Sequence, residues 1–103
     1  MASQEIIHLG SQLITKDFGL DETELADIDT MFELESRLEK VVQYLLDKDF
    51  QRLVNAMYRI DLPESQFKAI LATAEPDKVA QTLSKAILDR EMEKAALRLK
   101  YRE

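Results

Sequence analysis

The chain has 103 residues, of which 46% are hydrophobic and 33% are charged, and its formal net charge is −6 at pH 7. These proportions are typical of one ordered globular domain and exclude an intrinsically disordered chain. Two glycines, two prolines and no cysteine argue against a turn-rich β architecture and exclude disulfide and thiolate sites. The net acidity disfavours a general nucleic-acid binder.

Neither a targeting segment nor a membrane span is visible in the sequence. The N-terminus lacks a basic region followed by an apolar run, and no segment approaches the roughly 18 to 20 apolar residues that a membrane span requires. We therefore expect a cytoplasmic protein that makes no membrane contact.

The hydrophobic spacing predicts an all-α fold, a compact bundle of five to six helices with a long C-terminal helix. We expect a single domain over residues 1–103. The predicted helices span residues 4–17, 22–28, 31–47, 50–60, 63–72 and 76–101. Of these, we expect 31–47, 50–60 and 76–101 to frame the core.

The first helix can be capped by Ser3 and should end before Gly19, which suits a left-handed C-terminal turn. Gly10 lies on its apolar face and would permit the close approach of a neighbouring helix.

Two capping-box patterns follow, at Asp21–Glu24 and at Thr30–Glu33. They allow either one helix through both or two helices with a break near Asp29. We favour the break, because the apolar stripe after Thr30 is out of phase with the one that presents Leu25 and Ile28.

The helix over 50–60 is predicted to be the core helix around which the others pack. At 100° per residue, one helical face carries Phe50, Leu53, Val54, Met57 and Ile60. Asp49 is the expected N-cap, and Pro63 stops this helix and opens the next. If the Phe50 ring belongs to the core, Phe50→Ala would destabilise the fold by about 3–5 kcal/mol.

The last helix, if unbroken over 76–101, is about 39 Å long. Its second half gains an apolar face of its own, named here the C-terminal stripe: Leu88, Met92, Ala95 and Leu99. A helix with two apolar faces needs two neighbours. Either the first helix folds back over the stripe, which is the simpler alternative, or a second copy or another protein covers it.

Charge is distributed unevenly along the chain. Residues 17–39 contain nine acids and one base, whereas residues 94–102 contain four bases and no acid. A basic ridge of Arg90, Lys94 and Arg98 recurs every four residues. It is either a solvated face favoured by the helix dipole or a contact strip for an acidic partner or RNA. RNA is the weaker alternative because no aromatic residues alternate with the charges.

The sequence contains no complete catalytic or metal-binding motif. Glu5 and His8 have the Glu-x-x-His spacing of di-metal bundles, but those sites need the motif twice and the chain has one histidine. The acidic residues 21–35 lack the glycine and ligand spacing of a calcium loop. We therefore predict no catalytic residue, no metal site and no cofactor, and no small-molecule ligand is indicated.

One string carries a family resemblance, which covers about residues 40 to 100. The chain resembles small uncharacterised all-helical bacterial proteins in Asp49-Phe50-x-Arg52-Leu53, in Tyr58-Arg59-Ile60-Asp61 and in the charged C-terminal helix. The resemblance implies a bacterial, intracellular setting. It implies no activity and no site residue.

These observations predict a non-catalytic protein–protein interaction or regulatory module that binds a protein partner or self-associates as a homodimer through its C-terminal helix. The predicted partner-binding residues are Leu88, Met92, Ala95, Leu99, Arg90, Lys94 and Arg98. The first alternative is a nucleic-acid-binding accessory protein that uses the basic ridge. A carboxylate or metal-dependent enzyme is the weakest alternative.

Overall fold

The computed structural model describes residues 4–101, and over this range the chain forms α-helices and one 3-10 turn without a β-strand. The elements are α1 (Gln4–Phe18), α2 (Met31–Lys48), α3 (Phe50–Ile60), α4 (Glu64–Thr73), the 3-10 turn η1 (Pro76–Lys78) and α5 (Val79–Lys100). The all-α prediction is confirmed. None of the helices in this range is both long and apolar enough to cross a bilayer.

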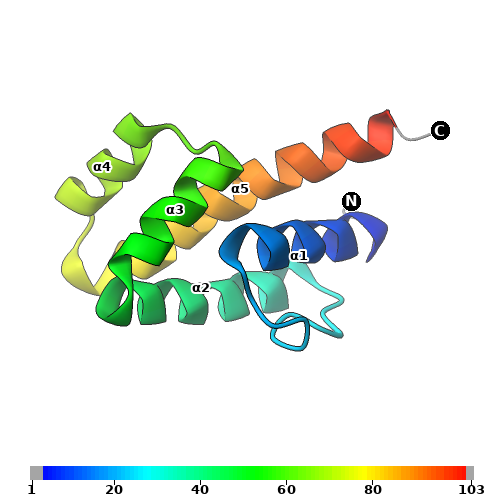
Figure 1. The fold of residues 1–103 in the computed structure, drawn as a ribbon, viewed down its shortest axis with the longest axis horizontal. Coiled ribbons are helices and arrows are strands. Elements are labelled where there is room, and N and C mark those ends of the chain that lie inside the picture. Colours follow the sequence, from blue (N-terminus) through cyan, green and yellow to red (C-terminus); the bar gives the residue numbers. More distant parts are fainter. Residues whose placement is uncertain (1–3, 102–103) are drawn as a thin grey trace.

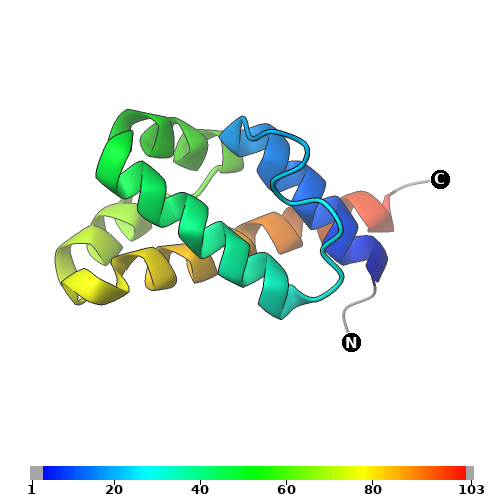
Figure 2. The same cartoon turned by 90° about the horizontal axis from the view of Figure 1, so that it is seen from below.

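The longest helix, α5, contacts all four other α-helices. Its 22 residues extend about 33 Å, most of the 41 Å long axis of the molecule. Figure 1 shows α1 beside the C-terminal half of α5 and α4 near the other end. Seen from below in Figure 2, α2 crosses α5 obliquely. The prediction that α3 is the central helix is therefore wrong, because α5 is the element that the others pack around.

Three helix ends follow the sequence predictions. The Thr30 hydroxyl accepts a hydrogen bond from the backbone N–H of Glu33 at 3.1 Å, which caps α2. The Asp49 carboxylate accepts one from the N–H of Arg52 at 3.3 Å, which caps α3. Gly19 has φ +63° directly after α1, the left-handed conformation expected of a residue that ends a helix.

The predicted helix 22–28 is not formed, and its residues make turns instead. The Asp21 carboxylate accepts a hydrogen bond from the N–H two residues later at 2.9 Å, as in an Asx turn rather than a helix N-cap. The Arg37 guanidinium of α2 donates to the carbonyl oxygens of Glu24 and Ala26, at 3.3 and 3.2 Å. Because this side chain supplies the donors, those carbonyls need no helical partners.

The core is made of side chains from α1, α2, α3 and α5 together with the 19–30 segment, Leu62 and Phe67 of α4. Its largest fully buried apolar side chains are Phe18, Ile14, Ile28, Leu34, Leu38, Leu45, Leu53, Ile60, Leu83 and Ile87. Leu25 and Ile28 are buried as predicted, although no helix presents them.

Phe50 does not belong to this core. Its ring is 45% exposed and stacks on Phe67 of α4, with 6.2 Å between the ring centroids. The buried face of α3 is made of Leu53, Ala56, Met57 and Ile60. The face of α3 that packs on the core is therefore rotated toward Ala56 relative to the predicted face. The prediction of a core role for Phe50 is therefore wrong.

Gly10 permits the close approach of α1 to α5, as predicted from its place on the apolar face. A Cβ atom built on this buried glycine would overlap the methyl group of Met92 and lie 3.0 Å from its sulfur. The Met92 side chain thus occupies the space that any larger residue at position 10 would need.

We expect Gly10→Ala to stabilise the wild-type protein by less than the gain in helix propensity of about 1 kcal/mol, because the terminal methyl group of Met92 must move to make room. In a Met92→Ala background the overlap is gone, and Gly10→Ala should then stabilise by about 1 kcal/mol. Urea denaturation of all four proteins measures this coupling. Equal effects of Gly10→Ala in both backgrounds would contradict the contact.

A second pair of variants tests the orientation of α3. Leu53→Ala should destabilise the fold by about 2–5 kcal/mol, because that side chain is fully buried. Phe50→Ala should cost less than about 2 kcal/mol, since much of the ring already lies in water. Chemical denaturation of both variants gives the comparison, and a larger loss for Phe50→Ala would contradict the observed orientation.

Candidate functional site

The C-terminal stripe lies largely beneath α1. Leu88 and Ala95 are buried, Met92 is half-buried against Gly10, and Leu99 is half-buried. This is the fold-back arrangement that the sequence allowed. Binding of a partner to the stripe stays a prediction, and it would require α1 to move.

The basic ridge is not a continuous free strip. The Arg90 Nε donates to the Ile60 carbonyl oxygen at 3.1 Å, and its guanidinium also pairs with Asp61 at 3.5 Å and with Glu93. Lys94 is held by two carboxylates, described below. Arg98 is the exposed member of the three.

Two carboxylates and one ammonium meet between α1 and α5, and we call Asp17, Glu91 and Lys94 the acid–lysine cluster. The Lys94 Nζ lies 3.0 Å from the Asp17 Oδ2 and 3.1 Å from the Glu91 Oε1. Glu91 is 0% exposed, and neither of its oxygens accepts a hydrogen bond of good geometry from the described residues.

The electrostatics of this cluster follow from burial and charge. Burial, and then repulsion by Asp17, raise the pKa of Glu91 to about 7 against the attraction of Lys94. Burial alone would lower the pKa of Lys94, but the contacts with Asp17 and Glu91 outweigh it and raise that pKa. The cluster is thus able to hold a proton near neutral pH.

The C-terminal end of α1 is held by two arginines of α3. The Arg52 guanidinium donates to the Phe18 carbonyl oxygen at 3.0 and 3.2 Å and to that of Gly19 at 2.7 Å. Arg59 donates to the Asp17 carbonyl oxygen at 3.2 Å. These cations satisfy carbonyls that a helix leaves unpaired at its end and complement its dipole.

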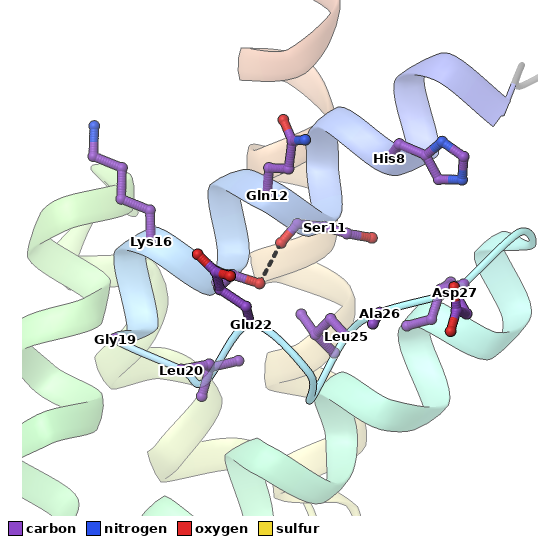
Figure 3. Close-up of a pocket in the computed structure, with 12 residues that line it drawn as sticks. His8, Ser11, Gln12, Lys16, Gly19, Leu20, Glu22, Leu25, Ala26 and Asp27 are labelled. Atoms are coloured by element: carbon purple, nitrogen blue, oxygen red, sulfur yellow. Dashed lines mark hydrogen bonds between the residues drawn. The ribbon is translucent and has the colours of Figure 1, made fainter.

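A cleft of about 800 Å³ lies between α1 and the 19–30 segment (Figure 3). Its lining mixes acids and bases with a few apolar side chains: His8, Ser11, Gln12, Thr15, Lys16, Gly19, Leu20, Glu22, Leu25, Ala26, Asp27 and Ile28. Figure 3 shows Gln12 and Lys16 directed away from Leu20 and Leu25, which lie across the cleft.

Three polar side chains of this cleft, Ser11, Thr15 and His8, have partners within the chain. The Ser11 hydroxyl donates to the Ile7 carbonyl at 3.0 Å, and that of Thr15 donates to the Ser11 carbonyl at 2.8 Å. Both hydroxyl protons are thus engaged by α1 itself. The His8 Nε2 lies 3.4 Å from an Asp29 carboxylate oxygen at the surface. Across residues 4–101, no three His, Asp or Glu side chains gather to hold a metal ion.

A second, apolar groove of about 210 Å³ lies between α3 and α4, and we call it the α3–α4 groove. It is lined by Phe50, Val54, Met57, Tyr58, Leu62, Glu64, Phe67, Lys68 and Leu71. The stacked rings of Phe50 and Phe67 belong to its lining. An ion pair of 3.0 Å between Glu64 and Lys68 lies among its polar residues.

The chain corner after α3 opens this groove. Asp61 ends α3 with φ +63°, and Pro63 occupies the N-cap position of α4. Of the ten residues of α4, only Phe67 is buried. Sequence reasoning missed the groove because it assigned Phe50 to the core. The sequence signal that could have indicated the groove is that α4 contains apolar residues such as Leu71 in addition to its core residue Phe67.

Substitution of Lys94 and substitution of Arg98 should change the stability of the fold by different amounts. Lys94→Met leaves the buried Asp17 and Glu91 side chains without their ammonium partner and should destabilise the fold at pH 7. We expect about 2–4 kcal/mol, near the lower end for a buried partner, because the Lys94 side chain is 20% exposed. Arg98→Met, the matched control, should change the free energy of unfolding by less than about 0.5 kcal/mol. Equal effects in urea denaturation would contradict the structural role of Lys94.

Comparisons of the chain with protein-family models, with curated proteins and with solved structures gave no match. The resemblance to small helical bacterial proteins therefore stays a prediction.

Proposed function

We propose that the protein is a non-catalytic protein-interaction module of the cytoplasm and that the α3–α4 groove is its docking surface. The observation that carries this proposal is the exposed aromatic lining of the groove, in which Phe50 is 45% and Tyr58 63% exposed. Aromatic residues and methionine are enriched where proteins bind one another, and an apolar patch with polar residues around it is typical of a docking site.

The size of the groove supports an apolar side chain of a protein partner as its occupant. Its volume of about 210 Å³ is smaller than the roughly 300–1,000 Å³ of small-molecule pockets. Anchor side chains that fill a desolvated pocket contribute most of the binding energy of protein interfaces. This surface fits an apolar or aromatic residue on a partner helix. Such a residue would have Glu64 and Lys68 on one side and Tyr58 on the other.

The predicted alternatives receive less support. Self-association through the C-terminal stripe would require α1 to leave α5, so we place the docking surface at the groove. A nucleic-acid-binding role would depend on the basic ridge, but Arg90 and Lys94 already bind groups of this chain.

Site-specific photocrosslinking tests the proposal. A benzoylphenylalanine in place of Tyr58 reports on the groove, and one in place of Tyr44, which is 61% exposed on α2, is the matched control. Both proteins are expressed in the native cells and irradiated there. We expect a discrete adduct from position 58 only, and we expect Leu71→Asp to abolish it by placing a charge in the apolar lining.

The mass of the adduct distinguishes the possible partners. Twice the chain mass of 11.9 kDa indicates a second copy, and any other discrete mass indicates a different protein. Adducts that form equally from both positions, or an adduct from position 58 that survives Leu71→Asp, would contradict the proposal. The absence of an adduct from position 58 would do so as well.

A further inference from the structure

The acid–lysine cluster contains one more buried acid than base. Within the described part of the chain, Lys94 is the one ammonium in contact with the Asp17 and Glu91 carboxylates, and it comes from the same helix as Glu91. With both acids ionised, the contact between α1 and α5 contains an unbalanced negative charge. With a proton on Glu91, the remaining pair of Asp17 and Lys94 is balanced.

Among residues 4–101, the arginines of the surrounding elements bind groups other than the Glu91 carboxylate. From α3, Arg52 and Arg59 face this end of α1, but they donate to its backbone carbonyls. From α2, Arg37 donates to carbonyls of the 19–30 segment and pairs with Glu33. On α5 itself, Arg90 is directed to Ile60, Asp61 and Glu93.

We infer that the acid–lysine cluster is a proton-dependent latch that holds α1 on α5. When Glu91 loses its proton to solvent, the buried charge is unbalanced and α1 is held less firmly. The part of α5 that α1 packs against, which includes Met92 opposite Gly10, then loses that cover. This inference is independent of the α3–α4 groove.

The direction of the pH effect follows from the two states of Glu91. With α1 in place, its pKa is about 7, against an ordinary value of 4.5 in water. A raised pKa means that the protein with α1 on α5 binds this proton more tightly than the protein with α1 released. The proton therefore stabilises the α1–α5 contact fully below about pH 4.5, and this stabilisation is lost as the pH rises to about 7. Above that pH the loss is complete and the profile levels off.

Amide hydrogen exchange of the full chain between pH 5 and 8, corrected for the intrinsic exchange rate, tests the latch. In the wild type, the opening equilibrium of α1 should rise by about tenfold per pH unit from 5 to 7 and then level off, while α3 changes much less. Glu91→Gln, which cannot titrate, should remove this rise. The matched control Glu93→Gln, an exposed acid on the same turn, should retain it.

Three results would overturn the inference. The first is a pH-independent α1 in the wild type, and the second is an unchanged rise in Glu91→Gln. The third is an equal loss of protection in all helices, which would indicate a global pH effect. If Glu91→Gln does not fold, NMR titration of the wild-type Glu91 carboxyl carbon decides instead. A midpoint near 7 supports the latch, and a midpoint below about 5.5 overturns it.

Discussion

The close approach of α1 to α5 is the contact on which the rest of the structure depends. Gly10 contributes no side chain on α1, and the fully buried Ala95 contributes only a methyl group on α5. The second apolar face of α5 is therefore covered by the chain itself. The same contact brings the end of α1 under Arg52 and Arg59 of α3 and encloses Glu91 without access to water.

The predictions of helix ends succeeded because helix ends depend on neighbours along the chain. Thr30, Asp49 and Gly19 mark helix ends because each acts on backbone within three residues of itself. The predicted helix 22–28 failed because Arg37, more than ten residues away, takes the carbonyls of the segment. A local sequence pattern cannot indicate a hydrogen-bond donor that belongs to another helix.

The candidate surface was harder to predict, for a related reason. Periodicity shows that Leu88, Met92 and Ala95 share a face, but it cannot show which element covers that face. Likewise, the spacing of Arg90, Lys94 and Arg98 gives no information on which of them bind groups of their own chain. The α3–α4 groove depends on the direction in which α4 leaves the corner at Asp61 and Pro63, which is a tertiary property.

The acid–lysine cluster and the α3–α4 groove are formed by different pairs of helices. The acid–lysine cluster belongs to the contact of α1 with α5, whereas the groove belongs to α3 and α4. The first turn of α1 and the last turn of α5 lie at one end, and α4 lies toward the other (Figure 1). Attachment to a sensor surface through either of those turns would thus leave the aromatic side chains of α3 and α4 directed toward the solution.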